Sequence, residues 1–92
     1  MFGHAHEGDF DPSAIAAVPP SPGAYRLWSR GRVLFVGVAF GARSLRTELN
    51  RHLRGDFGPI TQAASHFDCL VAHTAAHAHE LYRSLYAASG LR

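Results

Sequence analysis

Hydrophobic and polar positions follow two different periods along this chain, and each period predicts a different kind of element. Residues 24–28 alternate between apolar and polar side chains, and residues 33–38 form a nearly continuous apolar run. Between them, Arg30 and Gly31 form a two-residue turn signal. These features predict a β-hairpin. The continuous run predicts that its strand is buried on both faces, which suits the middle strand of a small sheet.

Apolar residues then recur at helical spacing. Residues 42–53 carry Ala42, Leu45, Leu49 and Leu53 on one face, and a glycine-rich segment follows. This pattern predicts a helix that ends at the glycine-rich segment.

Three further elements complete the predicted order. Residues 60–64 predict one short helical turn, and residues 67–72 predict a third strand. Residues 75–88 predict a second long helix, which Thr74 caps and Gly90 ends. The predicted order is therefore β-β-α-(α)-β-α, which belongs to the α/β (α+β) fold class.

The first residues of the chain show no hydrophobic period. Asp11 and Ser13 are both candidates to cap a short turn through Ile15. We expect a flexible or draped N-terminal segment over residues 1–17 and one folded domain over residues 18–92.

Length and composition set outer limits. The chain has 92 residues, enough for one domain with a small core. Its one cysteine, Cys69, excludes an internal disulfide and is expected to be a small buried side chain. A reducing cytosol suits such a protein, so we expect a cytoplasmic location. No apolar run approaches the ~20 residues that a membrane helix requires, and the acidic start does not resemble a signal peptide.

Charge is distributed unevenly. All nine basic residues are arginine. Residues 26–54 contain seven of them and a single acid, Glu48, so this stretch carries a net charge of +6. A basic stretch attracts polyanions, and guanidinium groups can bind two phosphate oxygens at once. The same arginines would also serve simply to solvate the surface of a helix.

Two tripeptides at the predicted hairpin carry a resemblance to a known family. Gly23-Ala24-Tyr25 and Phe35-Val36-Gly37 stand where the GIY-YIG nuclease domain has Gly-Ile-Tyr and Tyr-Ile-Gly. The arginine-bearing helix, the third strand and Glu80 follow in family order over about residues 18–89. The chain most closely resembles the version in the excision-repair nuclease UvrC. The resemblance implies a three-stranded antiparallel sheet flanked by helices, one divalent metal ion and cleavage of DNA phosphodiester bonds in DNA repair.

The resemblance also implies a role for each candidate residue. Glu80 would hold Mg²⁺ or Mn²⁺, because hard cations prefer carboxylate oxygen. Tyr25 would position or deprotonate the attacking water. Arg46 would bind the phosphate, and Arg43, one helical turn earlier, is the second candidate for that role. His52 would lie near the leaving group.

The expected nucleic-acid surface consists of helix arginines. Its members are Arg43, Arg46, Arg51 and Arg54. DNA is the expected partner, with RNA as a second candidate, and no membrane partner is expected. A homodimer is a candidate assembly, because small nucleases can pair to cut both strands.

Two positions depart from the family pattern. Phe35 occupies a place where the family carries a tyrosine hydroxyl, and a phenyl ring cannot relay a proton. Val38 stands where UvrC-type sequences carry a lysine. Loss of a general base costs about 10²–10⁴ in rate. Two functions therefore stay open: a metal-dependent endonuclease, and a catalytically inactive domain of the same fold that binds nucleic acid or a protein.

Simple structural roles are open for the same residues. Tyr25 would then be a half-buried strand aromatic, and Glu80 would pair with Arg83 on the helix surface. A transition-metal site is a further alternative, since His73, His77 and Glu80 are spaced i, i+4, i+7. That site requires a helix that begins by His73, whereas capping by Thr74 leaves His73 outside the helix.

Overall fold

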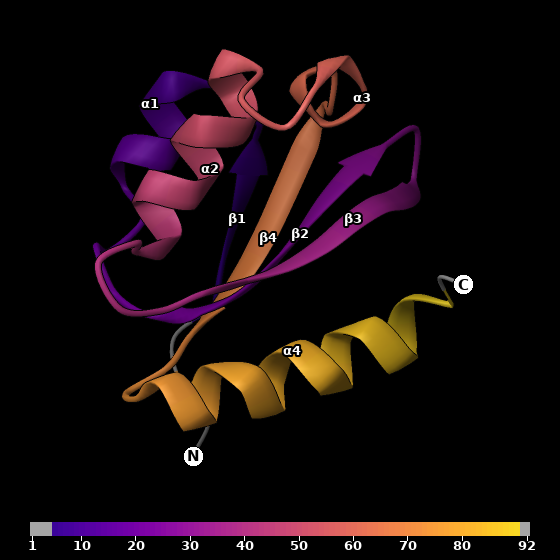
Figure 1. Ribbon diagram of the computed structural model, residues 1–92. Coiled ribbons are helices and arrows are strands. Elements are labelled where there is room, and N and C mark those ends of the chain that lie inside the picture. The colour runs from indigo at the N-terminus through magenta and orange to yellow at the C-terminus, as the bar shows by residue number, and fades with distance from the viewer. Residues whose placement is uncertain (1–4, 91–92) are drawn as a thin grey trace.

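The structure is a computed structural model that describes residues 5–90. Within these residues, four antiparallel strands form one sheet with helices on both faces (Figure 1). The strands are β1 (Ala5–Asp9), β2 (Gly23–Ser29), β3 (Arg32–Ala39) and β4 (His66–Val71). Their spatial order is β1-β4-β2-β3. The mixed α/β class predicted from the sequence is confirmed.

The four helices of the described part of the chain cover the sheet unequally. They are α1 (Pro12–Ala16), α2 (Leu45–Arg54), α3 (Pro59–Gln62) and α4 (Ala75–Ser89). α1 and α2 lie on one face, with α3 at the end of α2, while α4 alone crosses the other face over β2 and β3 (Figure 1). None of these helices, in the part of the chain that the structure describes, is long and apolar enough to cross a membrane.

The N-terminal segment differs from the prediction. The sequence predicts three strands, whereas the structure adds β1, which pairs antiparallel with β4 along its whole length. Every second residue of β1 is exposed and none of its five residues is a large hydrophobe. The strand therefore lacks the apolar period on which sequence reasoning depends, and its backbone pairing with β4 defines it instead. Residues 1–4 lie outside the described residues.

Local signals set the helix boundaries. Asp11 caps α1 by accepting a hydrogen bond from the Ala14 N–H at 2.8 Å. α2 begins at Leu45 rather than at residue 42, because the Ser44 hydroxyl accepts a hydrogen bond from the Thr47 N–H at 3.2 Å. Thr74 caps α4 in the same way, as the sequence predicts.

β2 and β3 form the predicted hairpin. Arg30 and Gly31 have φ values of 54° and 75°, the left-handed pair typical of a tight two-residue turn. A register shift between Leu27 and Trp28 marks a bulge that leaves Leu34 without a cross-strand partner. From Phe35 onward the pairing is regular.

The middle strand of the sheet is not the one that the sequence predicts. β2 lies between β4 and β3, whereas β3, with its continuous apolar run, lies at the edge of the sheet. Both faces of β3 are nevertheless covered, by α4 on one side and by α2 and α3 on the other. The helices on its two faces thus account for the apolar run, which does not depend on a strand on each side of β3.

The hydrophobic core lies between the sheet and the helices α1 and α2. Its fully buried side chains come from α1, β2, α2 and β4, and they include Ile15, Leu27, Leu45, Leu49 and Phe67. Because β2 and β4 contribute every second residue to this face, the core fixes which side chains point toward α2.

Two motif glycines are required by packing. Gly37 lies directly opposite Tyr25, and a Cβ at residue 37 would collide with the Tyr25 ring. A Cβ at Gly23 would collide with the Leu70 carbonyl oxygen and lie 2.7 Å from a Leu45 methyl group. Both glycines therefore allow a close approach that any larger residue would prevent.

Substitution of Gly37 by alanine is expected to lower the free energy of unfolding by about 3 kcal/mol, because the added methyl group overpacks the Tyr25 ring. Urea denaturation measures the loss. Gly41→Ala is the matched control, since no atom lies within 4 Å of a Cβ there and only its φ of 65° is strained. That control is expected to lose about 1 kcal/mol, and equal losses in the two variants would contradict the packing role of Gly37.

Candidate functional site

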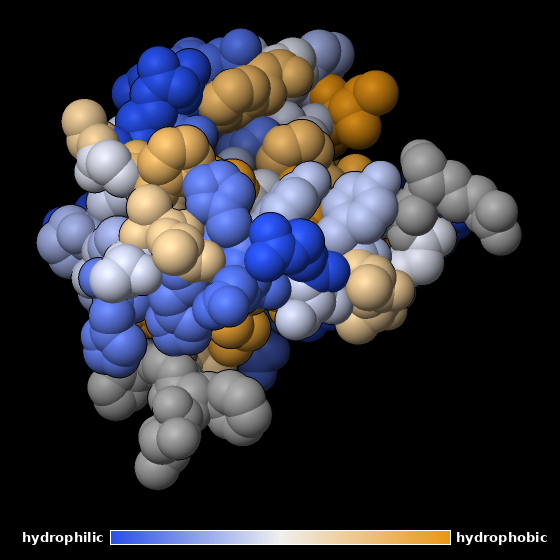
Figure 2. Space-filling model, turned by 60° about the horizontal axis from the view of Figure 1, so that its bottom comes forward, coloured by the Kyte–Doolittle hydropathy of each residue, from blue (hydrophilic) through white to orange (hydrophobic). Residues whose placement is uncertain are grey.

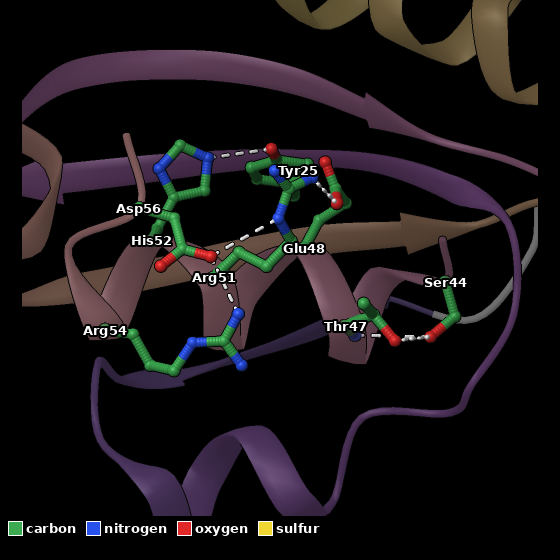
Figure 3. Close-up of polar contacts among 8 residues, drawn as sticks. All are labelled: Tyr25, Ser44, Thr47, Glu48, Arg51, His52, Arg54 and Asp56. Carbon is green, nitrogen blue, oxygen red and sulfur yellow. Dashed lines mark hydrogen bonds and ion pairs between the residues drawn. The ribbon is translucent and has the colours of Figure 1, made fainter. Parts of the chain in front are cut away.

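A buried hydrogen-bonded chain links three elements of the fold. The Tyr25 hydroxyl lies 2.9 Å from His52 Nε2 (Figure 3), and His52 Nδ1 lies 2.9 Å from the Thr61 hydroxyl. Tyr25 is 2% exposed and His52 is fully buried. β2, α2 and α3 therefore meet at one imidazole ring.

The local sequence explains why these side chains meet. Tyr25 projects from β2 toward α2 because it alternates with residues that face α4. On α2, His52 lies seven positions after Leu45 and three after Leu49, which places it on the buried face of the helix. The sequence thus predicts His52 as a candidate, but its helical position makes it part of the core rather than a surface side chain.

Burial keeps Tyr25 and His52, the two titratable groups of the hydrogen-bonded chain, uncharged at neutral pH. Burial, together with the nearby Arg51 guanidinium, lowers the pKa of His52 to about 4. Burial and the Glu48 carboxylate raise the pKa of Tyr25 well above its ordinary value. The phenol therefore stays protonated and cannot take a proton from water at neutral pH.

The neutral imidazole is fully hydrogen-bonded. It carries one N–H and one unprotonated nitrogen, so it donates one of its two hydrogen bonds and accepts the other. Tyr25 and Thr61 each have a hydroxyl that can take either part. The arrangement satisfies both ring nitrogens without a charge, as a buried polar group requires.

Ion pairs along α2 and the turn after it neutralise two of the predicted nucleic-acid-binding arginines. Arg51 lies 3.0 Å from Glu48 and 3.6 Å from Asp56, and Arg54 lies 2.7 Å from Asp56 (Figure 3). The hydrogen bond from Arg54 lowers the pKa of the Asp56 carboxyl. Arg51 also lies over the Phe57 ring, 4.5 Å from its centroid. These contacts engage the guanidinium groups within the protein.

The other two predicted arginines lie at the start of α2. Arg46 donates from Nε to the Val18 carbonyl oxygen at 2.9 Å, and Arg43 is exposed in the turn before the helix. Neither forms an ion pair with an acid of the described residues. Both charges are thus left for an external anion, beside the positive end of the α2 dipole.

Glu80 does not join the other candidate residues. It is exposed on α4, whereas Tyr25 and His52 lie on the α2 side of the sheet (Figure 1). The space-filling view that brings the α4 side forward shows hydrophilic and hydrophobic side chains interleaved over the surface (Figure 2). The sheet therefore separates the predicted metal ligand from the predicted water-positioning hydroxyl.

The structure bears on the transition-metal alternative of His73, His77 and Glu80. Within residues 5–90, no group of three or more His, Cys, Asp or Glu side chains is arranged to hold a metal ion. His73 precedes α4, and its N–H donates to His77 Nδ1 at 3.3 Å. That hydrogen bond occupies one nitrogen of His77, and the Thr74 cap leaves His73 outside the helix. The cluster of His73, His77 and Glu80 therefore does not form, and the binding of Mg²⁺ or Mn²⁺ by Glu80 stays a prediction.

Sequence reasoning missed a second polar cluster on the α4 face. Arg26 on β2 and Asp68 on β4 are directly opposite each other, with Arg26 Nε 2.9 Å from Asp68 Oδ1. Trp28 Nε1 donates to the same oxygen at 3.2 Å. Only the strand register brings these residues together, so no spacing in the sequence predicts the cluster.

Phe35 lies beside the buried chain instead of taking part in it. Its ring centroid is 4.8 Å from that of His52 and 6.1 Å from that of Tyr25. It therefore packs against the imidazole as an apolar wall. The position at which the family carries a tyrosine hydroxyl is thus occupied by a phenyl ring that packs against His52.

Comparisons of the chain with protein-family models, with curated proteins and with solved structures find no match.

Acidification is expected to destabilise the fold through His52. The unfolded state takes up a proton near the ordinary pKa of 6.5, whereas the folded state does so only near 4. The free energy of unfolding therefore falls as the pH falls from 6.5 to 4, by roughly 3 kcal/mol for this one group. Urea denaturation at a series of pH values measures the decline.

His52→Gln is expected to flatten the decline, because glutamine does not titrate. His73→Gln, at an exposed position, serves as the control and should retain the wild-type slope. A wild-type slope in His52→Gln would show that another group governs the acid sensitivity.

Proposed function

We propose that this chain is a non-hydrolytic, nucleic-acid-binding module of GIY-YIG type. One observation carries the proposal: the Tyr25 hydroxyl is buried and bonded to His52, while Glu80 is exposed beyond the sheet. Hydrolysis of the family type requires a metal-bound carboxylate and an activated water at the same phosphate. The arrangement of these residues favours binding without cleavage.

The proposed binding surface is the N-terminal turn of α2. Arg43 and Arg46 carry charges that no acid of the described residues pairs with, and Ser44 caps the helix between them. Phosphate groups are attracted both by guanidinium and by a helix N-terminus. Arg51 and Arg54 contribute less, because Glu48 and Asp56 already neutralise them.

The order of elements supports the type of fold. β2, β3, α2, α3, β4 and α4 follow one another as the resemblance implies. Gly23, Tyr25 and Gly37 are accounted for by close packing in the sheet. The motif residues that this chain keeps are thus those that the fold requires. This supports a domain that has the fold without the hydrolytic activity.

Incubation of supercoiled plasmid with the protein and Mg²⁺ or Mn²⁺ is expected to give no nicking by the wild type or by Glu80→Ala. The reason is that Glu80 and Tyr25 cannot act on the same phosphate. Agarose gels of time courses, with preparations checked for contaminating nuclease, measure the conversion. Nicking by the wild type and by the exposed-acid control Glu7→Ala, but not by Glu80→Ala, would establish an endonuclease and overturn the proposal.

Binding to nucleic acid is expected to depend on Arg43. Arg43→Gln should weaken binding to a fluorescein-labelled DNA duplex several-fold and lower the slope of log affinity against log salt by about one phosphate contact. Fluorescence anisotropy over a range of salt concentrations measures both quantities, and an RNA strand of the same length compares the two partners.

Arg83→Gln is the matched control, since it removes the same charge from an exposed position on α4. It should leave the affinity nearly unchanged. Equal losses in the two variants would indicate a general charge effect rather than a site on α2, and absence of binding to either nucleic acid would contradict the proposed function.

A further inference from the structure

A hollow lies at the point where β3 ends and the chain turns into α2. Its volume is about 410 Å³, which falls within the range of small-ligand sites in proteins. The loop that joins β3 to α2 lies at the end of the sheet, beside the first turns of α4 (Figure 1). The residues that line the hollow are Val38, Phe40, Gly41, Ala42, Arg43 and Glu48. Because Arg43 belongs to the proposed binding surface, the hollow extends that surface toward Phe40.

One tight turn holds an aromatic and a cationic residue close together. The Arg43 N–H donates to the Phe40 carbonyl oxygen at 3.2 Å, which closes a four-residue turn. Gly41 in this turn has a φ of 65°, in the left-handed region that favours glycine. The first and last Cα atoms of a β-turn lie less than about 7 Å apart. Phe40 and Arg43 therefore line the hollow from the two ends of one turn.

Phe40 offers an open aromatic surface. It is 45% exposed, and His79 of α4 packs against it with 4.8 Å between the ring centroids. A hydrogen bond from His79 Nδ1 to the Ala75 carbonyl oxygen, at 2.8 Å, holds the imidazole in place. The Phe40 ring is thus supported from α4 while nearly half of the residue stays accessible. Aromatic side chains of this kind are the surfaces on which nucleobases stack.

The free charge at the hollow is positive. Arg43 is exposed and forms no ion pair with an acid of residues 5–90. Among the described residues that line the hollow, Glu48 is the one acid, and it is buried 3.0 Å from Arg51, which neutralises it. The hollow therefore suits an anion that also carries a flat apolar group. A nucleotide has both parts, since guanidinium binds phosphate and an aromatic ring stacks on a base.

We propose that the hollow holds one unpaired nucleotide of a single-stranded nucleic acid, with its base on Phe40 and its phosphate at Arg43. The inference rests on the proposed function and names the substrate class of the same surface. In a duplex each base is paired and stacked between its neighbours, so it would have to leave the helix to reach Phe40. A duplex therefore reaches Arg43 through its phosphates alone.

The charge beyond the hollow favours a strand over a free nucleotide. Arg46, in the first turn of α2, does not line the hollow and forms no ion pair with an acid of the described residues. Its charge is therefore available to a second phosphate of the same strand. Proteins that bind single strands combine a positively charged path for the backbone with aromatic side chains for the bases.

Fluorescence anisotropy with three fluorescein-labelled probes tests the inference. The probes are a short thymidine oligonucleotide, an oligonucleotide of the same length with abasic sites in place of the bases, and a duplex of that length. At one salt concentration the thymidine strand should bind several-fold more tightly than either of the others, because it alone has bases free to stack on Phe40. Thymidine monophosphate should displace the strand only at concentrations far above the Kd of the strand.

Phe40→Ala is the test variant. It should weaken binding of the thymidine strand roughly tenfold and leave binding of the abasic strand and the duplex nearly unchanged. Phe40→Trp keeps an aromatic face and should retain the affinity, whereas Phe40→Leu keeps only apolar volume and should lose most of it. Tyr86→Ala is the matched control, since it removes an aromatic ring that is 38% exposed on α4 and does not line the hollow. Circular dichroism checks the fold of each variant.

Equal affinities for the thymidine and abasic strands, or equal effects of Phe40→Ala and Tyr86→Ala, would overturn the single-strand inference. Either result would leave the proposed function intact if the probes still bind in an Arg43-dependent way. Displacement by thymidine monophosphate at concentrations near the Kd of the strand would assign the hollow to a free nucleotide and overturn the inference as well. Failure of all three probes to bind would overturn both the inference and the proposed function.

Discussion

A buried imidazole is tolerated only when it is uncharged and both of its nitrogens are hydrogen-bonded, and His52 meets both conditions. Tyr25 from the central strand and Thr61 from the short helix α3 supply the two partners. The position of α2 on the sheet and that of α3 against α2 therefore depend on one ring. Loss of either hydroxyl would leave a polar atom unsatisfied in the core, which costs more than the bond itself contributes.

The same burial gives Tyr25 and its neighbours a structural role instead of a catalytic one. A tyrosine that activates water must contact solvent and have a pKa close to the working pH. Burial instead raises the pKa of Tyr25, away from neutral pH. Its ring fills the space above Gly37, and Phe35 completes the wall beside His52. Side chains that resemble catalytic ones are thus committed to packing, while Arg43 and Arg46 at the start of α2 form no ion pair with an acid of residues 5–90.

Sequence reasoning succeeded where the signal is local. The hairpin, the helices α2 and α4, the Thr74 cap and the α/β class all follow from period, capping and turn residues. It failed where the signal is long-range. β1 has no apolar period, because it is recruited by backbone pairing with β4. The edge position of β3 could not be predicted either, since an apolar run reports that both faces of a strand are covered and not how many strands pair with it.

The candidate site was predictable in part for the same reason. Tyr25 and His52 were both candidates from the resemblance, yet their contact depends on the crossing of α2 over β2, which no spacing in the sequence encodes. The neutralisation of Arg51 and Arg54 depends on Asp56, which lies just beyond the helix and folds back on it. Glu80 and Tyr25 lie on opposite sides of the sheet because α4 covers the face away from α2. Which face α4 covers is set by the topology alone.

The pairing of β1 with β4 has a consequence for the order in which the chain can fold. During synthesis β1 is made before the other three strands of residues 5–90, but β4, its one partner among them, is made last. Contacts between segments so distant in sequence form late, because closing a long loop costs entropy before it is rewarded. β1 must therefore wait unpaired while the hairpin and α2 assemble. β1 is short, acidic and weakly apolar. While it is unpaired, such a segment has little tendency to associate with other nascent chains.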